Sequence, residues 1–258
     1  VKITKPALNL REELADLRKP SSIAGEALLR ADSVQEQRDL IGAGRKNLII
    51  NGGFDVWQRG TSFSGNGYTA DRWSQDLSGA TATTTRETFS IGQTDVPLSP
   101  KYYIRQDVST GNNYCRVMQR IEDLSQFSNK QITLSGWVRA VSGSTDITLD
   151  LIYLKDGSGS VYDYGVATIK PTPEWKKFEI TTTTQDLTGD TIGANSCLEI
   201  RLGQGSNAST SAYTWDFANV QLELGSVATD FEHRSYGEEL ALCQRYFLCL
   251  AGERPHGY

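Results

Sequence analysis

The chain has 258 residues, with 26 lysines and arginines against 31 aspartates and glutamates, and a net charge of −5. No run of basic residues stands out, so we do not expect nucleic acid as a partner, because that binding rests on clustered cations. The apolar runs are too short to span a bilayer, and the N-terminus lacks the apolar core of a secretory signal. The length suits one sandwich-sized domain with appendages, or two small domains.

Four widely spaced cysteines form no CxxC pair: Cys115, Cys197, Cys243 and Cys249. We therefore do not expect zinc, and a chain of this length needs no disulfide framework. The prediction is free, mostly buried thiols, which suits folding in a reducing cytoplasm.

Residues 1–19 predict one short amphipathic helix. Its apolar stripe has helical spacing and consists of Leu10, Leu14 and Leu17. So short a helix is marginal alone in water. The stripe therefore needs a partner, which is the body of the protein, another copy of the chain or a larger assembly.

Residues 21–44 predict two short helical turns. Ser33 and Glu36 have the spacing of a capping box. An apolar edge follows, formed by Val34, Leu40 and Ile41, and glycines end the segment. We expect this edge, like the leucine stripe, to contact other chains or the rest of an assembly.

Residues 47–73 mark the entry into a β-domain. The apolar run Leu48–Ile50 predicts a first strand, and Asn51-Gly52-Gly53 predicts a turn after it. A second turn signal, Asn66-Gly67, follows.

The sequence from Ser74 to Val227 predicts strands separated by turns about every ten residues. No long amphipathic helix interrupts it, which favours an antiparallel sandwich over an α/β fold. Beyond it, residues 238–250 predict a short helix, although residues 245–250 could equally begin a strand. The expected strands are 80–89, 102–108, 114–121, 131–140, 146–154, 161–169, 175–183, 197–202 and 213–224.

Two stretches resemble known families. ALLRADSVQEQRDLIGAG, followed by NLIINGGFDVWQRGTSF, resembles linker segments of phage tail fibres and related virion appendages, which sit just ahead of a distal β-domain. The order NLIINGGF, QITLSGWVRA, PEWKKFEITTT, CLEIRLG and TWDFANVQLELG is similar to jelly-roll carbohydrate-binding modules, over about residues 47–231. This second resemblance is more specific for fold than for ligand.

Together these features predict a mainly β protein. Residues 1–46 form a helical attachment or oligomerisation segment, 47–234 an antiparallel jelly-roll β-sandwich, and 235–258 a C-terminal extension with a short helix or strand.

Catalysis has little support in the sequence. The two histidines, His233 and His256, lie beside no evident nucleophile. Carboxylates are numerous, but nothing pairs two of them across a cleft as a glycosidase requires. We therefore expect a protein that is not an enzyme.

Aromatic side chains are the better candidates, because sugars stack their C–H faces on Trp and Tyr. The resemblance implies that Trp137 and Trp175 pack inside the sandwich. The candidates for a glycan platform are Trp57, Tyr68, Trp73, Tyr102, Tyr162 and Tyr164; otherwise these residues cover a sandwich edge or a subunit interface.

The same resemblance implies a structural calcium between the first and last strands, where Asp55 and Asp216 fall at the matching places. The alternative is a pair of edge residues held in hydrogen bonds. We expect no other cofactor.

The first prediction is a phage virion protein, of a tail fibre or similar appendage, that is made in the host cytoplasm and attaches to envelope glycan. Partners would be other virion proteins, and the resemblance implies a homotrimer. The alternative is a head fibre, capsid decoration or tail-assembly subunit that binds no sugar. A glycan-binding module cut from an enzyme is disfavoured, because residues 1–44 look like virion linkers.

Overall fold

The computed structural model describes residues 46–110, 113–143, 146–156, 163–204 and 212–249. The chain divides into two compact units, Val1–Lys46 and Asn47–Tyr258, and every element below belongs to the second. The predicted N-terminal helices lie outside the described residues, as do the predicted contact and glycan-binding residues Leu10, Leu14, Leu17, Val34, Leu40, Ile41 and Tyr162.

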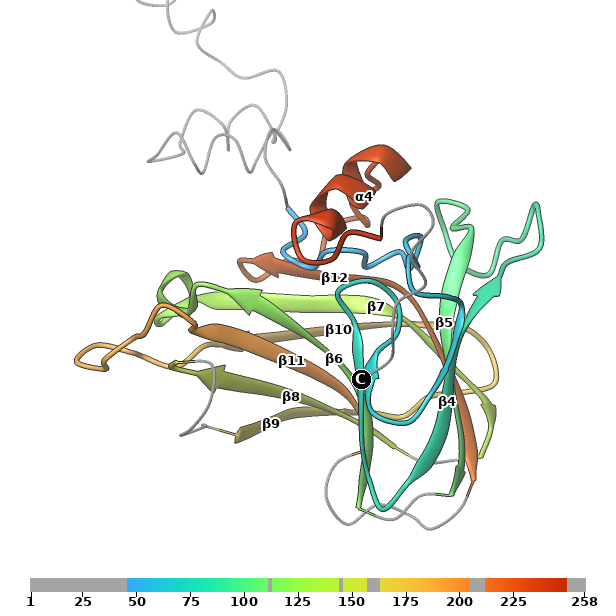
Figure 1. Cartoon of the computed structure of the whole chain (residues 1–258), viewed down its shortest axis with the longest axis horizontal. Helices are drawn as coiled ribbons and strands as arrows, with labels where there is room; N and C mark the ends of the chain where they lie inside the picture. The colour runs from blue at the N-terminus through green and yellow to red at the C-terminus, as the bar shows by residue number, and fades with distance from the viewer. Residues whose placement is uncertain (1–45, 111–112, 144–145, 157–162, 205–211, 250–258) are drawn as a thin grey trace, which may run out of the picture. The chain divides into compact units, whose positions relative to one another are not determined.

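The described chain contains twelve strands, one short 3₁₀ helix and one α-helix (Figure 1). The strands are β1 Ser62–Ser64, β2 Gly67–Tyr68, β3 Ser74–Ser78, β4 Thr81–Thr88, β5 Tyr102–Thr110, β6 Tyr114–Glu122, β7 Gln131–Ser142, β8 Ile147–Leu154, β9 Asp163–Ile169, β10 Lys176–Thr183, β11 Cys197–Gln204 and β12 Tyr213–Leu224. The helices are η1 Leu124–Phe127 and α4 Tyr236–Gln244.

The strands form two six-stranded sheets. Sheet A has the order β1-β4-β5-β12-β7-β10, and sheet B has the order β2-β3-β6-β11-β8-β9. Every strand pair is antiparallel. The predicted mainly β, antiparallel sandwich with a short C-terminal helix is therefore confirmed.

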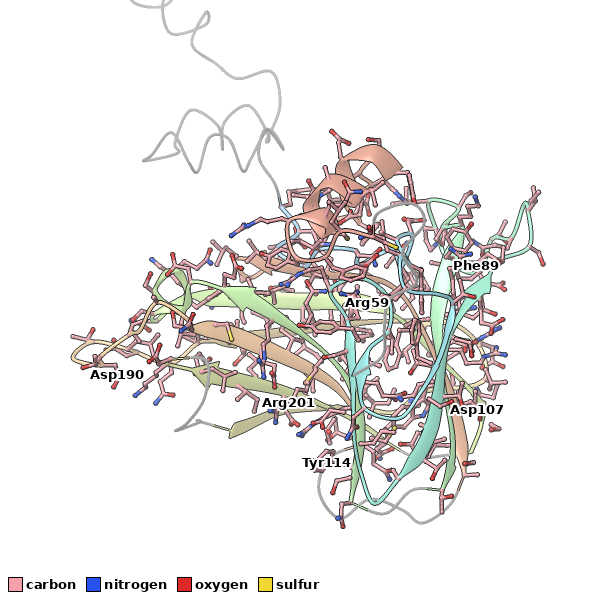
Figure 2. All side chains as sticks on the ribbon, viewed as in Figure 1. Arg59, Phe89, Asp107, Tyr114, Asp190 and Arg201 are labelled. Atoms are coloured by element: carbon pink, nitrogen blue, oxygen red, sulfur yellow. The ribbon has the colours of Figure 1, made fainter. Side chains whose placement is uncertain are left out.

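The core lies between the sheets and follows the two-residue period of strands. In β12, Trp215 and Phe217 are fully buried in this core, together with Leu198 and Ile200 of β11. The alternate residues of each strand point to the outer faces of the sandwich, where the charged side chains of both sheets lie. Figure 2 shows Arg201 and Tyr114 on sheet B and Asp107 on sheet A.

The predicted first strand at residues 48–50 is wrong, because this segment is irregular. It meets β12 at separate points: Leu48 N–H donates to Leu222 O at 2.9 Å, and Val220 N–H donates to Gly52 O at 2.9 Å. A Cβ on Gly52 would lie 2.0 Å from Val220 O, so glycine is required there. Side-chain bonds replace the strand ladder, since the Asn47 side-chain Oδ1 accepts from Ile49 N–H at 2.9 Å and from Leu222 N–H at 3.1 Å.

Helix α4 begins at a capping box formed by Ser235 and Glu238. It starts two residues earlier than predicted and ends at Gln244, and no strand follows over residues 245–249. Its Glu239 is buried and accepts from Asn51 N–H at 2.6 Å. The helix is thereby tied to the irregular entry segment, and Figure 1 shows the two side by side. Among the described residues, no helix is long and apolar enough to cross a membrane.

None of the four cysteines is in a disulfide, and three of them are buried, which confirms the prediction of mostly buried thiols. Cys115 faces the core between the sheets. Cys197 packs with Ile152 and Leu154 on the outer face of sheet B.

Candidate functional site

Burial removes two of the predicted glycan-binding aromatics. Trp73 is 0% exposed and Trp57 is 8% exposed. Each indole N–H is used inside the protein: Trp73 Nε1 donates to Asn51 O at 2.9 Å, and Trp57 Nε1 donates to Phe54 O at 2.7 Å. Both rings hold the entry segment in place, so the prediction that they present a sugar platform is wrong.

Tyr102 and Tyr164 are placed but offer no open platform in the described structure. The Tyr102 ring is partly buried, and the Arg86 guanidinium and the Lys101 ammonium lie 4.5 and 4.9 Å from its centroid. Tyr164 lies on β9, where side chains are outside the described part. Tyr68, on β2, is 53% exposed and is the one predicted aromatic that the structure leaves open among those it describes.

The calcium prediction is wrong at Asp216. Its carboxylate is 0% exposed and accepts from Arg105 Nε at 2.7 Å, Arg105 Nη2 at 2.9 Å and Arg139 Nε at 2.8 Å. Two guanidinium groups thus occupy the oxygens that a cation would need. The described residues contain no group of three or more His, Cys, Asp or Glu side chains able to hold a metal ion. Burial, with a smaller contribution from Glu239, raises the pKa of Asp55.

Trp175 is buried, as the core assignment implies, whereas Trp137 is only partly buried, and neither belongs to the cluster between the sheets. Both lie on the outer face of sheet A in a separate cluster, here called the outer aromatic cluster, which consists of Phe89, Val96, Tyr103, Trp137, Trp175 and Ala218. The Trp175 ring meets the Tyr103 ring edge-on at 5.5 Å. Trp137 and Trp175 therefore cover the sheet from outside.

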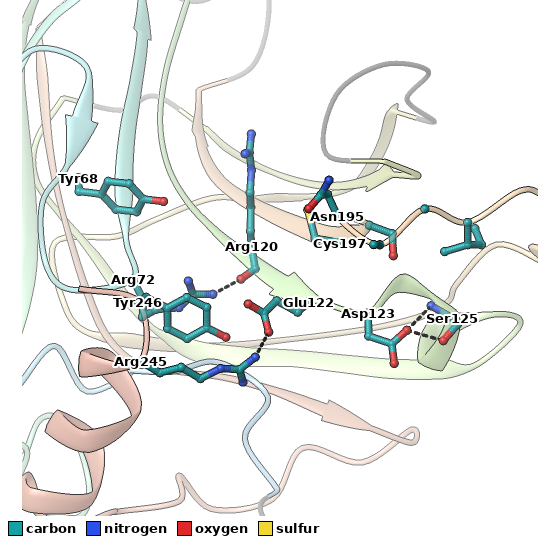
Figure 3. A pocket seen from close by; sticks show the side chains of 14 residues that line it. Tyr68, Arg72, Arg120, Glu122, Asp123, Ser125, Asn195, Cys197, Arg245 and Tyr246 are labelled. Atoms are coloured by element: carbon teal, nitrogen blue, oxygen red, sulfur yellow. Dashed lines mark hydrogen bonds and ion pairs between the residues drawn. The ribbon is translucent and has the colours of Figure 1, made fainter. Parts of the chain in front are cut away.

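A concavity with a volume of about 860 Å³ lies on the outer face of sheet B. We call it the trough. Its walls come from residues 68–72, 120–125, 192–197 and 245–246, which are far apart in sequence, and Figure 3 shows them facing one another.

Arg120 lines the trough and belongs to a charged cluster on the outer face of sheet B, the sheet B triad of Arg120, Glu199 and Arg201. The Glu199 carboxylate is 0% exposed and accepts from Arg120 Nε at 2.7 Å. Arg201 Nε donates to its other oxygen. The Arg120 side chain is 52% exposed. Its pKa is raised, first by the bond to Glu199.

One wall is a layered stack of cations and a ring. The Arg72 guanidinium lies 3.5 Å from the Tyr246 ring centroid and donates to the backbone oxygen of Arg120. Arg72 has φ 73°, a left-handed conformation. Arg245 lies 5.2 Å from the same ring and pairs with Glu122 at 2.5 Å. Burial raises the pKa of Tyr246.

The opposite wall is a loop held by backbone bonds. Gly193 N–H donates to Lys155 O at 2.7 Å, and a Cβ at Gly193 would lie 2.2 Å from Asp156 Oδ1. Ser196 O accepts from Asp123 N–H at 3.2 Å. These contacts fix the position of Asn195 on the trough wall.

Tyr68 closes the remaining side. The Arg59 guanidinium lies 5.0 Å from its ring centroid and 3.5 Å from the Phe247 centroid. The same guanidinium pairs with the buried Asp71 carboxylate at 2.8 Å. Arg59 is therefore held by Asp71 and Phe247. More than half of the Tyr68 surface remains exposed to solvent.

Sequence reasoning found Tyr68 and missed the rest of the trough. The alternation of β6 places Arg116, Met118 and Arg120 on the outer face, and this signal could have pointed to Arg120. Nothing local connects Asn195 or Tyr246 with β6, because their proximity depends on the tertiary fold.

The comparisons with known proteins give structural matches at low sequence identity. A scan against protein-family models matches none of them, and a search among curated proteins finds no similar sequence. Among solved structures, the enzymatically active domain of bacteriophage CBA120 tailspike protein 4 matches with 17% identity and a TM-score of 0.44, over 69% of this chain and 21% of that chain. The CBM22-1 xylan-binding domain from Paenibacillus barcinonensis matches with 14% identity and a TM-score of 0.43, over 72% and 99%.

A cyclase from Fischerella sp. TAU matches at a comparable level, with 16% identity and a TM-score of 0.45, over 72% of this chain and 99% of that chain. A fold does not determine what a protein binds, so the ligand of this sandwich has to be inferred from its own side chains.

Proposed function

We propose that this chain is part of a phage virion appendage, such as a tail fibre, and that its β-sandwich binds envelope glycan in the trough. The observation that carries the proposal is the open ring of Tyr68 beside a guanidinium and a carboxamide, those of Arg120 and Asn195, in one concavity of about 860 Å³. A pyranose needs an aromatic face for its C–H groups and planar polar groups for its hydroxyls, and the trough offers both.

The volume and polarity of the trough also fit a saccharide. Its size lies within the usual range for small-ligand sites, and it is lined by charged and amide groups as well as tyrosines. Its two walls are held by backbone and ion-pair contacts, so the binding groups are positioned in advance.

The virion part of the proposal is supported by the sequence. ALLRADSVQEQRDLIGAG and the NLIINGGF continuation resemble tail-fibre segments. We propose that the apolar stripe of Leu10, Leu14 and Leu17 joins chains as a homotrimer or holds the chain to other virion proteins.

The test is binding of the full-length chain to an array of purified bacterial envelope polysaccharides. We expect at least one polysaccharide to bind, and Tyr68→Ala to weaken that binding at least tenfold. The matched control is Tyr236→Ala, which removes another exposed tyrosine, 60% exposed, from α4 outside the trough. Equal binding by the wild type and Tyr68→Ala would contradict the proposal for the trough.

A purely structural subunit is the second candidate, and one surface feature favours it. Leu98 and Tyr236 are both well exposed and line the same cavity of about 280 Å³ near the start of α4. Apolar groups of this kind suit packing against another virion protein. This alternative would be favoured if Tyr236→Ala abolishes incorporation of the chain into particles and the wild type binds no polysaccharide on the array.

A further inference from the structure

The charges around the trough do not balance. Arg245 and Glu122 pair with each other at 2.5 Å, and Asp123 accepts from Ser125 N–H at 3.2 Å at the start of η1. The lining places three guanidinium groups, of Arg72, Arg120 and Arg245, against two carboxylates, of Glu122 and Asp123. This local excess of positive charge occurs in a chain whose net charge is −5.

Arg120 has guanidinium donors that no described residue uses. Its only described side-chain bond is from Nε to Glu199, so its terminal nitrogens have no hydrogen-bond partner among the described residues. The single charge of Glu199 is also shared with Arg201. In Figure 3 the Arg120 side chain stands between Tyr68 and Asn195. Its exposed end is thus available to a ligand in the trough.

We infer that the trough binds an acidic saccharide, with the anionic group of one sugar on the terminal nitrogens of Arg120. The inference rests on the proposed glycan function and narrows it to sugars that carry a carboxylate or a phosphate ester. The planar guanidinium matches the paired oxygens of either group, and such charge-assisted bonds are about twice as strong as neutral ones. The sugar ring then lies against Tyr68, and its hydroxyls bond the Asn195 amide.

The test uses the same polysaccharide array in three forms. Each polysaccharide is printed untreated, after chemical reduction of its carboxylates to alcohols, and after removal of its phosphate esters with hydrogen fluoride. We expect the full-length chain to bind acidic polysaccharides, and removal of the anionic group to lower affinity at least tenfold. The form that loses binding identifies whether the group is a carboxylate or a phosphate.

Arg120→Gln should lose at least tenfold in affinity for the untreated polysaccharide and little for its neutralised form. The matched control is Arg116→Gln, on the same face of β6, whose guanidinium pairs with Asp76 at 2.8 Å outside the trough. This control should bind as the wild type does. Folding of both variants is checked by thermal unfolding.

The binding should also weaken with salt, because raising ionic strength from about 0.1 M to about 1 M shortens the Debye length from about 10 Å to about 3 Å. Equal affinity for untreated and neutralised polysaccharides would overturn this inference and leave the glycan proposal standing. Binding to no polysaccharide in any form would instead overturn the proposed function.

Discussion

On the outer face of each sheet, one fully buried carboxylate accepts from two arginines. In sheet A, Asp216 of β12 lies between Arg105 of β5 and Arg139 of β7, and we call these three residues the sheet A triad. In sheet B, Glu199 of β11 is bonded by Arg120 of the neighbouring β6 and by Arg201 of its own strand. The chemical groups are alike, but their surroundings differ.

The sheet A triad is closed. Arg105 bonds Asp216 with both Nε and Nη2, and Arg139 uses Nε and Nη2 as well. Both arginines are only about a quarter exposed, at 26% and 27%. The Arg139 guanidinium also lies 4.9 Å from the Trp175 ring centroid. This triad ties three adjacent strands together and leaves few donors for a ligand.

The sheet B triad is open. Arg120 bonds Glu199 through Nε, about half of its side chain is exposed, and it lines the trough. No ring of the described chain lies over this guanidinium in the way that Trp175 lies over Arg139. Under our proposal only the sheet B triad can bind a ligand, because Arg120 keeps unpaired donors and lines a cavity.

The largest effect that tests this comparison is the loss of the sheet A carboxylate. Asp216→Asn leaves two guanidinium groups without a counter-charge in a mostly buried place, so we expect the free energy of unfolding to fall by about 3–5 kcal/mol. Urea unfolding measures it. The control is Asp107→Asn on the same face of β5, which is exposed and should cost about 1 kcal/mol or less. A similar small loss in both variants would show that the triad does not tie the strands.

The matching change in sheet B should lower the free energy of unfolding less than Asp216→Asn does, and it should change the affinity for polysaccharide more. Glu199→Gln removes a buried carboxylate, but Arg120 is half exposed and water can solvate it, so we expect a loss of about 1–3 kcal/mol. The polysaccharide array should show a severalfold change in affinity, since Arg120 loses the group that holds it. Folded Asp216→Asn should bind normally. Normal binding by Glu199→Gln together with weakened binding by Asp216→Asn would contradict the distinction between the open and the closed triad.

A third prediction compares Trp73, which is fully buried, with Tyr68, which is exposed and lines the trough. Trp73→Ala empties a fully buried site and should lower the free energy of unfolding by about 3 kcal/mol or slightly more. Tyr68→Ala removes an exposed ring and should cost less than about 1 kcal/mol. Thermal unfolding of the two variants separates a residue that supports the fold from one that serves the surface.

The sandwich could be predicted from the sequence because strand alternation is local. In β7 and β8, apolar residues recur every second position, and the period places one face in the core. The orientation of Trp73 was not readable in this way. Arg72, immediately before it, has φ 73°, and this left-handed turn together with the bond to Asn51 sends the ring inward.

Outer-face features were harder to predict for a related reason. The triads join residues that are 111 or 79 positions apart, as Arg105 is from Asp216 and Arg120 from Glu199. Such pairs depend on the order of the strands in each sheet, which the local patterns of one sequence do not reveal. Tyr68 was accessible to prediction because it follows a turn signal, Asn66-Gly67, that usually lies at the surface.

The smallest expected effect compares the inner and outer faces of sheet B through their thiols. Burial raises the pKa of Cys115 to about 12, from an ordinary value near 9. Between pH 9 and pH 10 the unfolded chain therefore releases a proton that the folded chain keeps, so stability falls as pH rises, by roughly 1 kcal/mol. Cys115→Ala should reduce the alkaline loss of stability by about this amount, as measured by urea unfolding at both pH values, while the buried Cys243, whose pKa is also raised, keeps its own contribution. Cys197, on the outer face, also has a raised pKa through burial, but the nearby Arg120 lowers it in part. A thiol reagent should then label native Cys197 before Cys115. Faster labelling of Cys115 would mean that the core between the sheets becomes accessible to the reagent more readily than Cys197 on the trough wall, which would contradict this prediction.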